Sequence, residues 1–174
     1  RRLHEARAGL RMAEKSQVPA RLDELGIELP PVAAAVASYV PAVRCGDVVY
    51  TSGQLPFVNG ELPKLGLVGE IGTHKGAQVS PEEAYELARI AVLNAVAAAA
   101  AEVGLENIER IVKVTGYVAS ATGFGGQPGV VNGASDILGE IFGDAGQHAR
   151  AAVGVAELPL GSPVEVDIIV QVRQ

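Results

Sequence analysis

The stretch ARAAVGVAELPLGSPVEVDIIVQVR (residues 149–173), close to the end of the chain, decides the fold. Residues 163–173 alternate apolar and polar side chains, which is typical of a β-strand with one buried face. Residues 149–157 predict a second strand, and the turn residues Leu158-Pro159 indicate that the two strands pair antiparallel. On the 163–173 strand, one face carries Val164, Val166, Ile168, Val170 and Val172, and the other carries Glu165, Asp167, Ile169, Gln171 and Arg173.

Two long helices are predicted upstream of these strands. The first begins at Ser80, because Ser80 and Glu83 form the S-x-x-E pattern of a capping box and Pro81 suits the first helical position. Gly104 ends this helix, and a second helix is expected over residues 130–142. The other expected elements are a short helix at 19–25, a hairpin with strands at 38–44 and 48–52, a strand near 65–68 and a strand at 111–119.

These elements predict an α+β fold in the order β-β-(β)-α-β-α-β-β, with both long helices packed on one face of a mixed sheet. The opposite face of the sheet is partly apolar, and a two-layer domain would leave it open. Because an open apolar sheet face usually marks a contact between subunits, we expect an oligomer.

The 174 residues, 48% of them apolar, suit one domain with a sizeable core. Residues 1–11 are expected to be a disordered tail or to derive from an expression vector. Residues 12–36 are expected to form an N-terminal extension with a short helix. Residues 37–174 are then a single domain.

Charge and cysteine content exclude several classes of function. The formal net charge of −6 argues against a general nucleic-acid binder, which needs clustered lysine and arginine. The single cysteine, Cys45, excludes an intrachain disulfide, a cysteine-based zinc site and an iron–sulfur cluster, and it fits a cytoplasmic location. No membrane span is expected, because Glu86, Arg89 and Asn94 interrupt the most apolar stretch, residues 84–103.

Motifs of known chemistry are scarce. The glycine-rich run GFGGQPG (residues 123–129) lacks the lysine of a phosphate-binding loop. No G-x-S-x-G sequence surrounds Ser52 or Ser135, so both are poor candidates for a hydrolase nucleophile. The histidines show no H-x-x-x-H pair, so we expect no metal site. The irregular segment 55–79 is expected to be a functional or mobile loop.

Arg150 is the first candidate for chemistry, because its neighbours on the predicted strand are small or apolar. A guanidinium there must find an anion or water. The small residues Ala152 and Gly154 share its face and leave room for a pocket in which the guanidinium grips a carboxylate. The alternative is a structural ion pair with an acidic residue of another subunit, and the residues alone do not choose between them.

Glu165 is the second candidate. If the two final strands pair directly through a tight turn, Glu165 lies opposite Ala152 and on the same face as Arg150, roughly 7 Å away along the strands. A small acid would then fit between the two side chains, with Glu165 holding a water molecule. The alternative is a glutamate that faces solvent, and a bulge at 160–162 would reverse the faces.

Several segments together resemble the Rid/YjgF superfamily, the reactive-intermediate imine deaminases also described as endoribonuclease L-PSP-like. The segments are SYVPAVRCGDVVYTSGQLP (38–56), VKVTGYVA (112–119) and ARAAVGVAELPLGSPVEVDIIV (149–170), together with Asn132 and their order along the chain. The resemblance implies a chorismate-mutase-like fold and a homotrimer with sites in the clefts between subunits. It also implies that no metal or organic cofactor is needed.

The resemblance also implies roles for individual residues. Arg150 matches the arginine that binds the substrate carboxylate, and Glu165 matches the acid that positions the hydrolytic water. Tyr39 matches an aromatic residue that lines the pocket across the interface. Ser52 and Gly53 match the segment beside the ligand, and Asn132 matches a helix-borne asparagine.

This chain departs from the family pattern at several positions and looks like a longer, divergent branch. Ala152 stands where active members often have cysteine, and Ser135 lies near the position of a lost helix aromatic. The loop at 64–78 is longer than in compact members and is expected to cover or fill the cleft.

Three functions follow as hypotheses. The first is hydrolytic deamination of reactive 2-imino or enamino acids to 2-keto acids and ammonia. The second is a non-catalytic protein of the same fold that binds a small carboxylate, which the changes at Ala152 and Ser135 favour. The third, a ribonuclease or translation inhibitor, is disfavoured by the net charge of −6.

Overall fold

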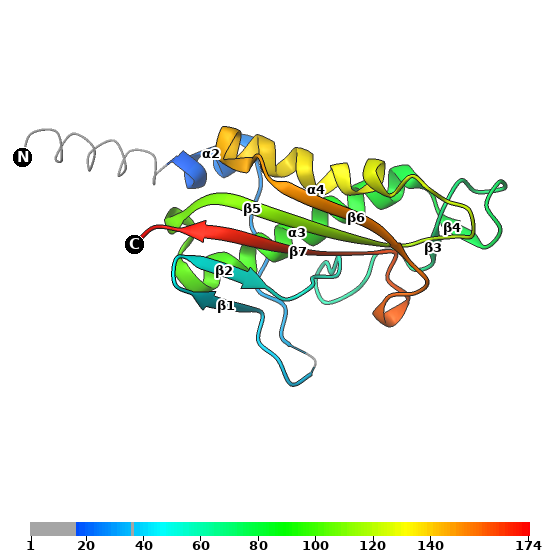
Figure 1. Cartoon of the computed structure of the whole chain (residues 1–174), viewed down its shortest axis with the longest axis horizontal. Coiled ribbons are helices and arrows are strands. Elements are labelled where there is room, and N and C mark those ends of the chain that lie inside the picture. The colour runs from blue at the N-terminus through cyan, green and yellow to red at the C-terminus, as the bar shows by residue number, and fades with distance from the viewer. Residues whose placement is uncertain (1–16, 36) are drawn as a thin grey trace, which may run out of the picture.

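The protein is an α+β structure with a five-stranded mixed sheet and its helices on one side of that sheet (Figure 1). The computed structural model describes residues 17–35 and 37–174. The sheet order is β1-β2-β7-β5-β6, and a separate pair is formed by β3 and β4. The strands are β1 Ala42–Cys45, β2 Val48–Thr51, β3 Leu67–Val68, β4 Ala77–Val79, β5 Ile108–Ala119, β6 Ala149–Val155 and β7 Val164–Val172.

The predicted element order is confirmed, with small changes at the ends. The helices are α2 Gln17–Leu25, α3 Pro81–Val103 and α4 Gln127–Phe142, and short 3₁₀ turns follow at Leu105–Asn107, Gly143–Gly146 and Pro159–Gly161. The strands β1 and β2 form the expected antiparallel hairpin. The expected tail at residues 1–11, like the first part of the expected extension, lies outside the described residues.

The expected pairing of the last two strands is wrong. The strand β5 lies between them, parallel to β6 and antiparallel to β7. The connection between β6 and β7 contains the 3₁₀ turn Pro159–Gly161, where Leu160 and Gly161 have φ values of 60° and 73°. This broader turn separates β6 from β7 far enough for the end of β5 to insert. Ser120 then donates its N–H to the Val155 carbonyl, and Ala119 donates its N–H to the Pro163 carbonyl.

The core lies between the sheet and the helices α3 and α4. The small side chains of α3 let another backbone approach closely, as at Gly133 of α4. A Cβ atom built there would lie 2.0 Å from the Tyr85 carbonyl oxygen of α3. The fully buried side chains that fill this layer include Ala84, Ala88, Ala91 and Ala95 from α3, Ile137 and Leu138 from α4, and Val49, Ile111, Val114, Ile168 and Val170 from the sheet.

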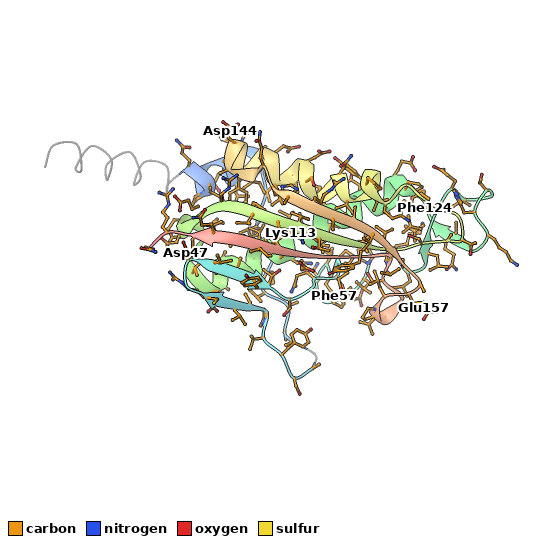
Figure 2. The ribbon with its side chains drawn as sticks, in the orientation of Figure 1. Asp47, Phe57, Lys113, Phe124, Asp144 and Glu157 are labelled. Carbon is orange, nitrogen blue, oxygen red and sulfur yellow. The ribbon has the colours of Figure 1, made fainter. Side chains whose placement is uncertain are left out.

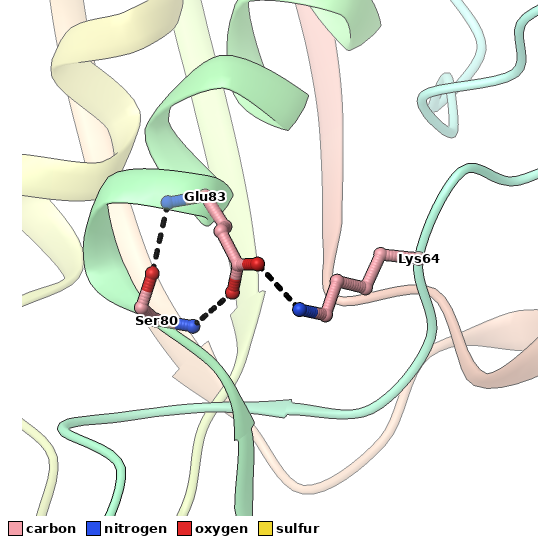
Figure 3. Close-up of polar contacts among 3 residues, drawn as sticks. All are labelled: Lys64, Ser80 and Glu83. Atoms are coloured by element: carbon pink, nitrogen blue, oxygen red, sulfur yellow. Dashed lines mark hydrogen bonds and ion pairs between the residues drawn. The ribbon is translucent and has the colours of Figure 1, made fainter.

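The segment at 64–78 is tied to the body of the protein at Lys64 and at Val68, whose carbonyl accepts from the Ala121 N–H. It contains β3 and part of β4, and Val68 is fully buried. Figure 3 shows the anchor at its first residue: Lys64 contacts Glu83, which also completes the capping box of α3. In that box the Ser80 hydroxyl accepts from the Glu83 N–H at 3.2 Å, and the Glu83 carboxylate accepts from the Ser80 N–H at 2.9 Å. The predicted start of this helix is therefore confirmed.

None of the helices in residues 17–35 and 37–174 is both long and apolar enough to span a membrane.

Replacing Gly133 by Ala should lower the free energy of unfolding by about 1–3 kcal/mol, because the new methyl group must push α4 away from the Tyr85 carbonyl. The matched control is Gly139→Ala on the same helix, where a Cβ meets nothing within 4 Å. That change should raise the stability by about 0.5–1 kcal/mol, since alanine is the better helix former. Chemical denaturation at one protein concentration measures both, and equal effects would contradict the close approach.

Candidate functional site

Arg150 lies on the edge strand β6 and points to the side of the sheet that the helices cover. Its register partner on β5 is Val114, which is fully buried against those helices. The guanidinium is half-buried and is held by acceptors of α4. Nη1 donates to Asn132 Oδ1 at 2.7 Å and to Ser135 Oγ at 3.2 Å, while Nη2 donates to the Pro128 carbonyl at 3.3 Å.

These contacts use three of the five N–H donors that a guanidinium offers. Within the described residues, Nε–H and the second Nη2 hydrogen of Arg150 have no acceptor. Arg150 makes no ion pair there. The side chain is therefore a fixed cation with donors left over, which is suited to binding an anion.

The other predicted residues of this region lie close by. Asn132 is exposed on the first part of α4, and Ala152 follows Arg150 on the same face of β6. The Pro128 carbonyl and the Ser135 hydroxyl are partners of Arg150 that were not predicted from the sequence. The helical spacing of Asn132 and Ser135 (i, i+3) places them on one face of α4 and was the available signal. We call Arg150, Asn132, Ser135 and Ala152 the arginine cluster.

Glu165 lies on β7 and faces the opposite side of the sheet. Its register partner on β5 is Tyr117, whereas the helix-facing positions of β7 are Val164, Val166 and Ile168. The carboxylate packs against Gly53: a Cβ atom built at that glycine would lie 2.8 Å from both Cδ and Oε2 of Glu165. Gly53 therefore makes room for the carboxylate.

Ser52 directly precedes Gly53, and its hydrogen bonds link it to the segment that carries Tyr39. The Ser52 hydroxyl donates to the Val40 carbonyl at 2.6 Å, and the Ser52 N–H donates to the Pro41 carbonyl at 2.8 Å. These bonds hold the segment that carries Tyr39 beside the end of β2. Tyr39 itself is 47% exposed. We call Glu165, Gly53, Ser52 and Tyr39 the glutamate cluster.

The acidic side chains of this face are partly desolvated. Burial raises the pKa of Glu165, and the negative charge of Asp167 raises it further. Burial also raises the pKa of Asp167. Two neighbours lower this pKa in part: the Tyr117 hydroxyl, which donates to the Asp167 carboxylate at 3.1 Å, and the positive charge of Lys113. Lys113 is labelled on this open face in Figure 2. Because the folded protein holds the Glu165 proton more tightly, this carboxyl contributes stability below its unfolded pKa and loses that contribution as the pH rises through its folded pKa.

The structure thus separates the two residues that were expected to lie about 7 Å apart on one face. Arg150 faces the helices and Glu165 faces the open side, because β5 intervenes and side chains alternate along each strand. The predicted residues form two clusters on opposite sides of the sheet, and one chain does not bring them together.

Two clefts in the described chain lie away from both clusters. The larger, of about 710 Å³, lies between α2 and the end of α4 and is lined by Arg21, Glu140 and Arg173 among others. The smaller, of about 370 Å³, lies between residues 30–34 and the turn that carries Asn59. Among the described residues, no three histidine, cysteine, aspartate or glutamate side chains gather as a metal site.

The chain matches a known protein family over most of its length. The family model described as "YjgF/chorismate_mutase-like, putative endoribonuclease" matches residues 19–172. The chain belongs to the YjgF family. The resemblance noted from residue 38 onward therefore extends into α2, and the chorismate-mutase-like fold is confirmed.

Relatives of this YjgF-family chain match it over nearly their whole length. Protein TCP17 of Trypanosoma cruzi is 40% identical over 90% of this chain and 95% of its own. A protein of unknown function from Agrobacterium tumefaciens is 37% identical, with a TM-score of 0.79 over 92% of this chain and 96% of its own. A crystal structure from Shewanella oneidensis, described as a "putative endoribonuclease", is 34% identical, with a TM-score of 0.81 over 90% of this chain and 100% of its own.

Replacing Asp167 by Asn in this YjgF-family protein should lower the pKa of Glu165, because it removes the neighbouring negative charge. The pKa should stay above the ordinary value for glutamate, since burial remains the larger cause. A ¹³C NMR titration of the Glu165 carboxyl measures the shift. Asp144→Asn, a change of an exposed acid near the end of α4, should leave this titration unchanged. If the titration midpoint of Glu165 is the same in Asp167→Asn as in the wild type, the charge of Asp167 does not influence Glu165.

Proposed function

We propose that this protein hydrolyses reactive 2-imino or enamino acids to 2-keto acids and ammonia, with Arg150 binding the substrate carboxylate. The observation that carries this proposal is the guanidinium of Arg150. Three acceptors of α4 hold it, and two of its N–H donors remain for a ligand. A planar guanidinium fixed in this way matches the two oxygens of a carboxylate and favours a small carboxylate-bearing substrate.

Glu165 supplies the acid–base chemistry of the proposed reaction. The carbon of a protonated imine is already electrophilic, so we expect no need for a metal or organic cofactor. Water adds to this carbon while Glu165 accepts a proton from it. Glu165 then returns the proton to the nitrogen. As the C–N bond breaks and ammonia leaves, the hydroxyl oxygen forms the C=O bond and its proton passes to Glu165. A glutamate whose pKa burial raises is suited to exchanging a proton in this way.

The proposal places the site between subunits of a homotrimer. One ligand cannot reach both clusters of the same chain, because they lie on opposite sides of the sheet. An assembly in which the arginine cluster of one subunit meets the glutamate cluster of another removes this obstacle. The exposed apolar side chains of Val43, Tyr50 and Val153 on the open face favour such an assembly, which would cover them.

A second function, binding a small carboxylate without turnover, is favoured by one observation. Ala152 offers only a methyl group where active members of the family often carry a thiol. The arginine cluster would still bind the carboxylate, and the protein would then act as a sensor or regulator.

The direct test is hydrolysis of 2-aminoacrylate, generated from serine by a dehydratase and followed as pyruvate. The wild-type protein should accelerate pyruvate formation, and Arg150→Ala should lower kcat/KM by about 100-fold or more because the charged anchor is lost. Arg21→Ala, which removes an exposed arginine paired with Glu24, is the matched control and should change nothing. Pyruvate binding that depends on Arg150, with no acceleration of any imine, would instead establish the carboxylate-binding function.

Co-expression of two inactive variants tests the position of the site. Arg150→Ala and Glu165→Gln chains with different affinity tags should each be inactive alone. In every mixed trimer one of the three interfaces would pair an intact Arg150 with an intact Glu165 from different chains, so about a third of the wild-type activity should return in purified mixed trimers. Light scattering should give three times the chain mass of 17.9 kDa. If purified mixed trimers show no activity, Arg150 and Glu165 do not act across subunits. If light scattering gives the mass of a single chain, there is no site between subunits.

A further inference from the structure

A chain of hydrogen bonds joins His148 to Arg150 through Ser135. His148 Nδ1 lies 2.6 Å from the Gly146 carbonyl oxygen, and its Nε2 lies 2.9 Å from Ser135 Oγ. Ser135 Oγ in turn accepts from Arg150 Nη1 at 3.2 Å. We propose that His148 is a positioning residue, which orients the Ser135 hydroxyl so that its oxygen holds the guanidinium of Arg150 for carboxylate binding.

The direction of each bond follows from the chemistry of its partners. A carbonyl oxygen only accepts, so His148 Nδ1 carries the hydrogen that it shares with Gly146. In a neutral imidazole Nε2 is then an acceptor, and the Ser135 hydroxyl donates to it. A guanidinium only donates, so the lone pairs of the Ser135 oxygen are left for Arg150.

Without His148 the Ser135 hydroxyl would be expected to donate to a different acceptor. A serine inside a helix commonly donates to the carbonyl four residues earlier, which here is that of Val131. Ser135 makes no such bond and donates to His148 instead. The imidazole therefore fixes the rotation of the hydroxyl, and Gly146 fixes the imidazole.

Ser135 differs from the other partners of Arg150 in being partly buried from solvent. Asn132 and the Pro128 carbonyl, the other two acceptors, belong to residues that are exposed to solvent, whereas Ser135 and His148 are half-buried. A guanidinium held from a sheltered side keeps its free donors in one orientation. The ligand then meets a preorganised cation and does not have to order it.

This inference rests on the proposed carboxylate binding by Arg150, but the bond directions have a test that does not involve activity. In ¹⁵N-labelled protein at about pH 8, where an ordinary histidine is neutral, the NMR signals of His148 should report the Nδ1–H tautomer. We call the hydrogen-bonded chain from His148 through Ser135 to Arg150 the relay. The more common Nε2–H tautomer at His148 would contradict the bond directions of the relay.

The functional test combines His148→Phe, His148→Gln and Ser135→Ala. His148→Phe keeps an aromatic ring but removes the acceptor, and it should weaken pyruvate binding and raise KM for 2-aminoacrylate by about five- to tenfold, with kcat nearly unchanged. His148→Gln should recover most of the loss, because its amide oxygen accepts from Ser135. The double variant His148→Phe/Ser135→Ala should bind no more weakly than Ser135→Ala alone, since His148 acts only through Ser135.

The matched control is Tyr85→Phe, which removes the bond of 2.8 Å between the Tyr85 hydroxyl and Asp136, the neighbour of Ser135 on α4. It should leave pyruvate binding unchanged. If Arg150→Ala impairs binding but His148→Phe does not, or if the double variant shows additive losses, the relay is wrong and the proposed function stands. If Arg150→Ala impairs neither binding nor turnover, the proposed function fails and the relay has no role in ligand binding.

Discussion

The hydrogen-bonded ladders on both sides of β5 determine to which side of the sheet Arg150 and Glu165 point. On one side β5 runs antiparallel to β7, and on the other it runs parallel to β6. Because successive side chains alternate between the two faces, the two registers assign each residue to one face. Val114 and Ile168 place Arg150 on the helix side, and Tyr117 places Glu165 on the open side. A shift of one residue in the β5–β6 ladder would turn Arg150 to the open side, and the same shift in the β5–β7 ladder would turn Glu165 to the helix side.

On the helix side, the packing of α4 gives Arg150 its fixed environment. Gly133 brings α4 against the Tyr85 carbonyl of α3, and the acceptors Asn132, Ser135 and Pro128 stand on this anchored helix. A guanidinium surrounded by acceptors on a rigid element loses little further freedom when it binds an anion. The same arrangement leaves no carboxylate of the described chain beside Arg150, so its charge remains free to act on a ligand.

On the open side, two neighbours determine the surroundings of the Glu165 carboxylate. Gly53 leaves space for it, and Asp167 places a negative charge nearby. The glycine lets the carboxylate lie close to the backbone at the end of β2, where water is partly excluded. Burial and the nearby negative charge then raise its pKa. One side of the sheet thus holds a fixed cation, and the other holds a carboxyl that binds its proton more tightly than usual.

Local patterns in the sequence were enough to predict the helices and most of the strands and to single out Arg150 and Glu165 as candidates, whereas Tyr39, Ser52, Gly53 and Asn132 followed from the family resemblance. Ser80 and Glu83 mark a helix start through a contact only three residues apart, and the alternation at 163–173 marks a strand because the side chains of one strand face two sides in turn. The pairing of β5 with both β6 and β7 depends on contacts between residues about 36–64 positions apart, which no local pattern records. Only the tertiary structure therefore decided that Arg150 and Glu165 face opposite sides, and that Ser135 and His148 stand beside Arg150. The physical reason is that a strand's neighbours are chosen by the packing of the whole sheet against its helices.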